Sequence, residues 1–306
     1  MSDADSLAVP ARPVPAPPDA EPVIVRAESP LREAARMFLR NRSAVVGLVL
    51  LTVVVATSIL GPWLYPVDPF EMVWSPLAPP GEEGFLLGTD YLGRDLVAGI
   101  IQGSRATLAV GGAAAAITIC IGVLVGALAG FYRGWVEEVL MRVTEFFQVL
   151  PPLLLAMVLV MLFTPSLVTI AIAIGVVSWT GTARLARAEF LRIRELEYVK
   201  GARVAGSRNR RIIWQVILPN AAPPLVVSAA LSVGVAILFE AGLSFLGLTD
   251  PNVMSWGYII GANRPYILDA WWAVTWPGLA IFLTVLAVSL VGDGLNDAFN
   301  PRLRQR

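Results

Sequence analysis

The chain has 306 residues, of which 56% are hydrophobic and only 15% are charged, and its formal net charge is zero. Soluble domains carry about 25% charged residues, so this composition excludes a water-soluble surface over most of the chain. The sequence has no histidine, the commonest general base and metal ligand, and its one cysteine, Cys120, excludes an internal disulfide. We therefore expect no catalytic residue, no metal site and no enzyme activity in this chain.

Residues 1–30 differ from the rest. They hold seven prolines and no aromatic residue, a composition that cannot bury enough apolar surface to offset its ordering entropy. No apolar core follows a basic start, so the segment does not have the pattern of a signal peptide. The sequence predicts a disordered cytoplasmic tail here.

Five long uncharged runs follow, and a helix of about 20 apolar residues crosses a bilayer. The run 146–183 has 38 residues and as one helix would reach about 57 Å. It must fold back, and the turn is expected at Thr164–Pro165–Ser166. The fifth membrane helix is expected to begin near Ala222, after a first part at the interface, because Pro219, Pro223 and Pro224 interrupt its run. The first, second and sixth spans are expected within 43–67, 106–132 and 270–292.

Basic residues give the orientation. With both termini in the cytoplasm, 20 of the 23 lysines and arginines lie inside. The three outside are Arg94, Arg105 and Arg264. The positive-inside rule favours this arrangement, so the sequence predicts an all-α membrane protein with six transmembrane helices and both termini cytoplasmic.

Within the spans, Glu240 is an acid in an apolar helix, where ionisable groups are costly and often functional. It could line a pore or hydrogen-bond another subunit, or it could extend outward to water. We interpret Pro151–Pro152, and the glycines Gly122, Gly126 and Gly130, as packing devices. The alternative for them is a helix that bends during transport.

The inner loop 184–211 is basic and has helical propensity. Small residues at Gly201, Ala202 and Ala205 would let a helix from Glu197 to Gly206 seat in a groove of another protein, and Gly206 can end it with a positive φ. Composition alone favours the alternative, a basic loop that anchors the chain on anionic lipid.

Spacing adds a resemblance at this loop. The run KGARVAGSRNRRIIWQVILPN resembles the "EAA" loop of ABC importer permeases, with Ala202, Gly206, Leu218 and Pro219 at the family's separations. Lys200 and Gly201 depart from the usual glutamate and alanine, which leaves a salt-bridge role of that glutamate in question. The resemblance implies a coupling helix that docks into an ATPase subunit. The residues expected to act there are Glu197, Lys200, Gly201, Ala202, Arg203, Gly206, Leu218 and Pro219.

Further segments extend the resemblance from about Pro30 to the end of the chain. Residues 87–95, LGTDYLGRD, are similar to the G-T-D-x-x-G-R-D signature of peptide importer permeases, and residues 240–248, 255–257 and 292–295 resemble other segments of that family. The nearest group is the C-type subunit of dipeptide and oligopeptide importers, which includes nickel and glutathione transporters. It implies the type I ABC importer permease fold in a bacterial inner membrane.

The same resemblance implies partners. These are a homologous second permease, two ATP-binding subunits and an extracytoplasmic substrate-binding protein. ATP and magnesium would be bound by the ATPases, since no segment here has the Gly-Lys-Ser/Thr ending of a P-loop. No cofactor is expected in this chain.

The long outer loop, 65–105, is rich in acids and proline. We expect an ordered segment over the channel mouth that helps to receive the binding protein through Asp90, Arg94 and Asp95. The alternative is a passive connector in which Asp90 and Arg94 hold a local turn.

The expected organisation is the tail (1–30), a first helix with the external loop (31–105) and a five-helix permease core (106–306) that contains the coupling loop (184–221). The expected function is the channel subunit of an ATP-driven importer of di- or oligopeptides. The alternatives are the same machine carrying nickel chelates or glutathione, and an ion-coupled secondary transporter, which should show an internal repeat and several midplane acids.

Overall fold

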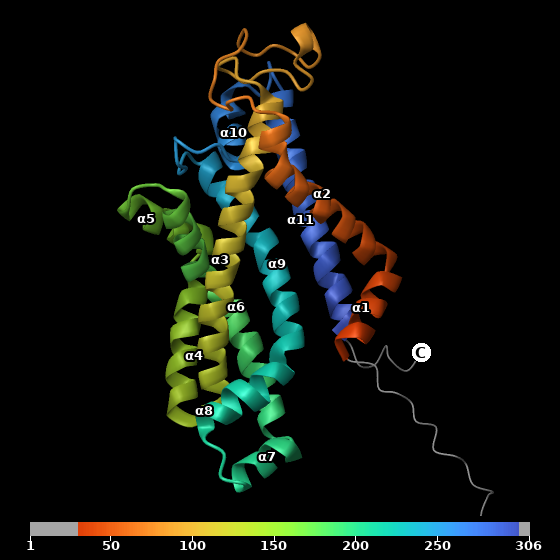
Figure 1. The fold of residues 1–306 in the computed structure, drawn as a ribbon. Coiled ribbons are helices and arrows are strands. Elements are labelled where there is room, and N and C mark those ends of the chain that lie inside the picture. Colours follow the sequence, from red (N-terminus) through yellow and green to blue (C-terminus); the bar gives the residue numbers. More distant parts are fainter. Residues whose placement is uncertain (1–29, 300–306) are drawn as a thin grey trace, which may run out of the picture.

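The computed structural model describes residues 30–299, so the predicted tail lies outside the described part of the chain except for Pro30. Across the described residues the chain is helical and forms no β-strand, with only two isolated β-bridges. The helices stand side by side in a tall bundle (Figure 1). The segment between α2 (Arg42–Leu64) and α3 (Leu96–Tyr132) lies at one end, and α7 (Glu197–Val204) lies at the other. The predicted all-α architecture is confirmed.

Five helical segments are long and apolar enough to cross a membrane. A sixth candidate is the pair of helices α4 (Gly134–Val149) and α5 (Pro152–Leu162), which are bent by 89° at the break between them. The expected six spans are therefore reached when the bent pair counts as one span. The five are α2 (Arg42–Leu64), α3 (Leu96–Tyr132), α6 (Leu167–Arg194), Asn209–Phe245, which contains α9 (Leu218–Phe245), and α11 (Trp272–Phe299).

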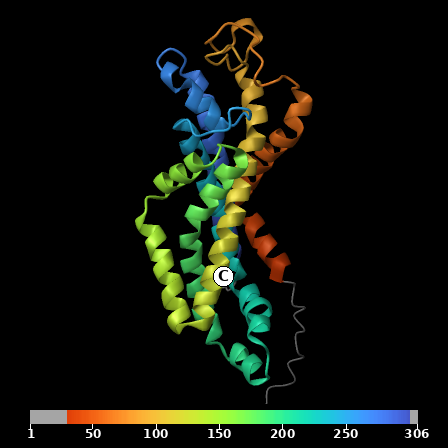
Figure 2. The same ribbon diagram turned by 90° about the vertical axis from the view of Figure 1, so that its left-hand side faces the viewer.

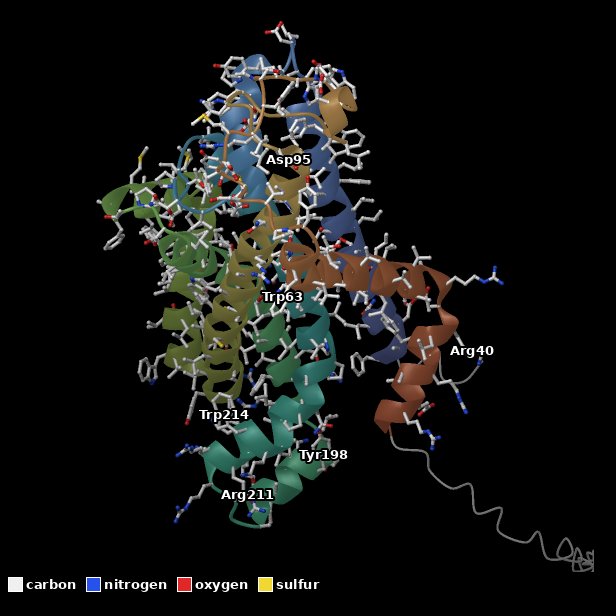
Figure 3. The ribbon with its side chains drawn as sticks, turned by 45° about the horizontal axis from the view of Figure 1, so that its top comes forward. Arg40, Trp63, Asp95, Tyr198, Arg211 and Trp214 are labelled. Carbon is white, nitrogen blue, oxygen red and sulfur yellow. The ribbon has the colours of Figure 1, made fainter. Side chains whose placement is uncertain are left out.

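Short elements connect these spans, and they are given at the end of this paragraph. Figure 3 shows Tyr198 and Arg211 at the α7 end of the bundle and Asp95 toward the opposite end. The structure contains no membrane, so the cytoplasmic position of both termini stays a prediction. The short elements are α1 (Pro30–Arg40), η1 (Glu82–Gly84), α7 (Glu197–Val204), α8 (Asn209–Arg211), η2 (Ile212–Ile217), α10 (Trp256–Asn263) and η3 (Arg264–Tyr266).

The third span, expected in the first part of the run 146–183, is not one continuous helix. α4 (Gly134–Val149) ends before Leu150, and α5 (Pro152–Leu162) begins after Pro151. Pro151 disfavours a helical conformation at Leu150, and neither proline can donate a backbone hydrogen bond. Figure 2 shows α4 at the edge of the bundle, with α5 at a steep angle to α4. The interpretation of these prolines as packing devices was wrong, because they break the helix. The turn predicted at 164–166 is confirmed between α5 and α6.

The ends of two spans also differ from expectation. α3 begins at Leu96 and includes Arg105, which was expected in the outer loop. Asp95 caps this helix, because its Oδ1 accepts a hydrogen bond from the Val97 amide over 2.8 Å. α11 continues to Phe299, beyond the expected end at residue 292. In both cases a span was taken to end at a charge, although helices continue into the interface.

The α3 and α6 helices pack closely along a row of glycines. A Cβ atom at Gly122 would lie 2.5 Å from the Cβ of Thr182, and one at Gly126 would lie 2.3 Å from the carbonyl oxygen of Ala183. Gly130 meets the backbone of Arg187 in the same way, at 2.7 Å. Glycines four apart allow such contact because they carry no side chain. The packing role predicted for these three glycines is confirmed.

Candidate functional site

The α7 helix is a short helix of eight residues between two long helices. α6 ends at Arg194, and Leu196 precedes α7 in an extended conformation. The chain leaves α7 through Gly206, whose φ of +76° lies in the left-handed region that favours glycine. The Ser207 amide donates to the Ala202 carbonyl over 3.1 Å and closes the last turn. The short helix and its terminating glycine lie where the sequence placed them.

One residue of α7 holds it to the bundle. Val199 is fully buried in a hydrophobic core with side chains of α6 and of the segment that leads into α9. Arg203 adds a contact to α3, because its guanidinium lies 5.9 Å from the centroid of the Phe131 ring. A displacement of α7 therefore acts directly on three of the long helices. The other core residues near Val199 include Phe190, Ile193, Ile212, Ile213 and Ile217.

The outer surface of α7 is open. Val204 is 89% exposed and Tyr198 is 47% exposed. A Cβ atom at Gly201 would meet nothing within 4 Å. Lys200 pairs with Glu197 at 3.2 Å, but both side chains face solvent, so the pair contributes little stability. Exposed apolar side chains beside an uncovered backbone form a surface that a partner can cover.

The segment after α7 departs from the predicted start of the fifth span. The helix runs through Leu218 and Pro219 and includes Pro223 and Pro224 in its interior. The Leu218 amide donates to the Ile213 carbonyl, five residues earlier, in the π-helical turn η2. The prediction of a start near Ala222 was wrong. Tertiary packing outweighs the bonds that the prolines lack, because Ala221 and Leu225 are buried in the same core as Val199.

At the opposite end, the outer loop is held by its own signature residues. The Thr89 hydroxyl donates to the Ser75 carbonyl and accepts from the Ala78 amide, both over 2.8 Å. Asp90 Oδ1 accepts from the Leu92 and Arg94 amides at 2.8 and 2.9 Å. These bonds fold residues 75–94 into an ordered turn.

Asp90 and Asp95 are only 5% and 3% exposed. Burial raises the pKa of Asp90 above its ordinary value, while the bonds from the Arg94 and Leu92 amides and the charge of Arg94 act in the opposite direction. Neither carboxylate presents a surface to another protein in this structure. Their expected contact with a binding protein stays a prediction that this geometry does not favour.

Arg94 and Asp95 connect the loop to neighbouring helices. The Arg94 guanidinium lies 5.0 Å from the Phe70 ring centroid and donates to the Tyr258 hydroxyl of α10 at 3.3 Å. Asp95 Oδ2 accepts a hydrogen bond from the Tyr65 hydroxyl. This bond, with burial and the charge of Asp95, raises the pKa of Tyr65 to about 12. The alternative expectation, a local turn held by Asp90 and Arg94, describes these contacts.

Glu240 is buried inside this chain and is 1% exposed. Its Oε1 accepts from the Ser244 hydroxyl at 3.0 Å and from the Ser255 hydroxyl at 2.7 Å. Ser255 also caps α10, since its Oγ accepts from the Tyr258 amide at 3.0 Å. Glu240 thus ties α9 to α10. It does not extend to water, and in this conformation it offers no surface to a pore or a second subunit.

The hydrogen-bond partners of Asp95 and Glu240 could not be predicted from the sequence. Tyr65 and Asp95 lie 30 residues apart, and Glu240 and Ser255 lie 15 apart. The two residues of each pair lie on different elements, and no sequence periodicity relates positions on different elements. The only available signal was that a buried acid must find donors.

Comparison with known protein families shows which family has this sequence pattern. Residues 122–305 match the family described as binding-protein-dependent transport system inner membrane component. Residues 29–80 match the N-terminal transmembrane domain of oligopeptide transport permease C. The chain belongs to the binding-protein-dependent transport permease family. Permeases of this family are transport components, so α7 and the outer loop are the two ends of a membrane transport subunit.

Relatives resemble the chain over nearly its whole length. A di/tripeptide transport system permease protein of Pseudomonas aeruginosa is 40% identical over 294 residues, which cover 94% of this chain and 97% of the relative. A dipeptide transport system permease protein of Escherichia coli K12 is 41% identical, covering 90% and 95%. That of Haemophilus influenzae is 36% identical, covering 93% and 99%.

A solved structure supports the fold of this permease. An inward-facing crystal form of the MetNI methionine ABC transporter has a chain that matches with a TM-score of 0.54 at 18% identity. The match covers 64% of this permease and 93% of that chain. The expected type I ABC importer permease fold is confirmed at the level of architecture.

Proposed function

We propose that this permease forms one half of the passage of an ATP-driven importer of di- or oligopeptides. The peptide cargo is inferred from the similarity to di/tripeptide and dipeptide permeases over more than nine-tenths of both chains. The partners are a homologous second permease, two ATP-binding subunits and an extracytoplasmic binding protein that delivers the peptide. The location is the bacterial inner membrane, with both termini in the cytoplasm, which the arginine distribution favours.

In this proposal α7 is the contact with an ATPase subunit. Its exposed Tyr198 and Val204 would lie in a cleft of the ATPase, and its buried Val199 would carry movement to α6 and α9. The remaining residues expected to act there are Glu197, Lys200, Gly201, Ala202, Arg203, Gly206, Leu218 and Pro219. ATP and magnesium would be bound by the ATPases. The energy of nucleotide binding can shift the channel only if α7 contacts the two ATPase states differently.

Uptake by the complete complex tests the cargo. The permease is reconstituted in proteoliposomes with its partner subunits and the binding protein, and uptake of labelled dipeptides, tripeptides, glutathione and a nickel chelate is compared. ATP-dependent, binding-protein-dependent uptake of peptides is expected. Uptake of only glutathione or the chelate would replace the cargo assignment, and uptake driven by an ion gradient without ATP would overturn the mechanism.

A further inference from the structure

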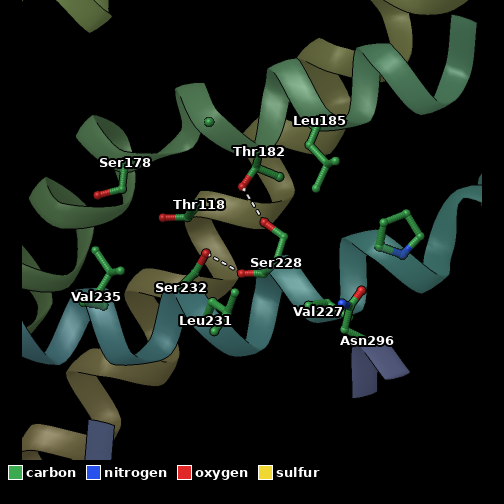
Figure 4. A pocket seen from close by; sticks show the side chains of 13 residues that line it. Thr118, Ser178, Thr182, Leu185, Val227, Ser228, Leu231, Ser232, Val235 and Asn296 are labelled. Atoms are coloured by element: carbon green, nitrogen blue, oxygen red, sulfur yellow. Dashed lines mark hydrogen bonds between the residues drawn. The ribbon is translucent and has the colours of Figure 1, made fainter. Parts of the chain in front are cut away.

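A cavity opens between α6 and α9, with α3 behind it and the end of α11 at one side (Figure 4). Its volume is about 470 Å³. Hydroxyl and amide groups from all four helices face it, although these helices are otherwise apolar. The polar lining residues are Thr118, Ser178, Thr182, Ser228, Ser232 and Asn296.

The cavity lies at membrane depth. Ser178 follows the start of α6 by 11 residues, and Ser228 follows the start of α9 by 10. At 1.5 Å per residue both lie about 15–17 Å inside their helices. Both residues thus lie well inside helices long enough to cross a bilayer, while Asn296, near the end of α11, places the cavity toward the end of the bundle where α11 stops.

The hydroxyls of this lining have few partners. Thr182 and Ser228 approach each other only to 3.4 Å, and Ser232 donates to the Ser228 carbonyl at 2.8 Å. Ser178 Oγ is buried and finds no hydrogen-bond partner within residues 30–299. A polar group without a partner at this depth is costly. Ser178 Oγ is itself enclosed by protein, so the hydroxyls that water or a polar ligand in the cavity would reach are those of the half-buried Ser228 and Ser232.

The polar character is confined to one side of α9. Val226 lies two residues before Ser228, is 44% exposed and lines a separate, apolar groove with Cys120 and Trp214. The two residues therefore differ in surroundings while sharing a depth and a helix. α9 thus has polar surroundings at Ser228 and apolar surroundings at Val226. This pattern is typical of a helix that has a water-filled passage on one side and lipid or packed apolar side chains on the other.

The lining also limits what could be bound. Its residues include no ionisable side chain. Hydroxyls donate and accept hydrogen bonds, and so match the N–H and C=O groups that every peptide carries. A lining without charge neither attracts nor repels the side chains of different peptides.

We infer that this cavity is a water-filled section of the passage and that its hydroxyls bind the peptide groups of the cargo during translocation. The inference rests on the proposed function for the identity of the cargo. The hydroxyls replace the water that surrounds the peptide groups, and they exchange partners readily as the peptide moves. Selection among peptides would then belong to the binding protein.

Cysteine labelling tests the water-filled cavity without requiring transport. Cys120 is replaced by alanine, and single cysteines are introduced as Ser228→Cys, Ser232→Cys and, as the matched control, Val226→Cys. A membrane-impermeant, positively charged thiol reagent is applied to both faces of membranes that contain the whole complex. Labelling at 228 and 232 but not at 226 is expected. No labelling at 228 and 232, while a cysteine at the exposed Glu83 is labelled, overturns the inference, and so does equal labelling at 226.

A second pair of variants tests the peptide contact. Ser228→Val combined with Ser232→Val removes both hydroxyls, and Ser228→Thr combined with Ser232→Thr retains them at nearly the same side-chain volume as valine. Peptide uptake is expected to fall about tenfold in the valine variant, with the threonine variant near wild type. Equal uptake in both variants overturns the peptide contact. If the wild-type complex imports no peptide, the proposed function fails, and the labelling contrast still decides whether the cavity is wet.

Discussion

Arg105 on α3 binds the backbone oxygen that Pro62 leaves without a helical partner on α2. Its Nε donates to the Ser58 carbonyl at 2.7 Å, and its Nη2 donates to the Ile59 carbonyl at 3.1 Å. In a regular helix the amide of residue 62 would bond the Ser58 oxygen, but proline has no N–H. Arg105 thus closes the gap that the proline opens and joins α2 to α3.

Replacing Arg105 by alanine should destabilise the permease by about 1–3 kcal/mol, because a backbone oxygen at the edge of the membrane loses its donor. The measurement is the melting temperature in detergent. The control is Pro62→Ala, which restores an amide to the same oxygen. The double variant should be less damaged than Arg105→Ala alone, and equal damage in both would show that the bond to Ser58 does not carry the effect.

Gly122, Gly126 and Gly130 form a glycine seam where α3 packs on α6, and this seam allows a matched test within one helix. Gly126→Ala places a Cβ 2.3 Å from the Ala183 oxygen, whereas a Cβ at Gly112 of the same helix meets nothing within 4 Å. The first change should destabilise the fold by about 1–3 kcal/mol, and Gly112→Ala should be neutral or slightly stabilising. Thermal denaturation of the two proteins in detergent checks this, and similar melting temperatures would contradict the contact.

Gly201→Trp should uncouple ATP hydrolysis from uptake or detach the ATPase, because the bulky side chain would occupy the docking surface of α7. The open space around Gly201 means that the permease itself should still fold and insert. A loss of about 2 kcal/mol in docking is expected. ATPase activity and uptake are measured on the purified complex, with Gly201→Ala as control. Normal hydrolysis and transport in the tryptophan variant would remove α7 from the ATPase interface.

The Tyr65 hydroxyl should contribute a pH-dependent part of the stability. Its pKa rises from 10.0 to about 12 in the folded state. A raised pKa means that the contribution is complete below pH 10 and is lost as the pH rises toward 12. Tyr65→Phe should lower stability by about 1 kcal/mol at pH 7 and flatten the fall between pH 10 and 12. Parallel curves for both proteins would exclude the bond to Asp95 as the cause.

Two neighbouring exposed acids of the outer loop, in η1, are available to a binding protein, as are Asp68 and Glu71. Glu82 and Glu83 are exposed, whereas Asp90 and Asp95 are buried. Glu82→Lys with Glu83→Lys should reduce stimulation of ATPase activity by the binding protein about threefold to tenfold, mainly through slower association. The same change should leave the basal ATPase rate unaltered. Unchanged stimulation would indicate that the loop is a passive connector.

Local and periodic signals predicted much of this molecule. Glycines spaced by four predicted a close helix contact, which the structure places between α3 and α6, and a glycine after a short helix predicted the end of α7 at Gly206. These features depend on residues close together in the sequence or on one face of a helix. The short helix α7 therefore lies where the sequence predicted it, and its role as a docking surface remains a proposal.

The features that the sequence did not predict depend on distant residues. Arg105 and Ser58 are 47 residues apart, so the arginine looked like a loop charge. The prolines at 151 and at 223 look alike in a sequence, but the first breaks its helix and the second lies within one. The difference comes from the buried core around Leu225, which holds α9 together despite missing bonds.

Two kinds of contact in the bundle should respond differently to force. α3 and α6 interlock backbone against backbone, so they can slide or separate only by unpacking the glycine seam. α6 and α9 face each other across a cavity, where Thr182 and Ser228 meet at 3.4 Å. α7 is anchored through Val199 in one core with α6 and with the segment that leads into α9, so a pull on α7 acts on both sides of the cavity. α3 also packs closely on α9, where a Cβ at Gly111 would lie 2.7 Å from Ile237 Cγ1. The cavity would therefore widen or narrow as a local gap in a bundle whose other contacts hold.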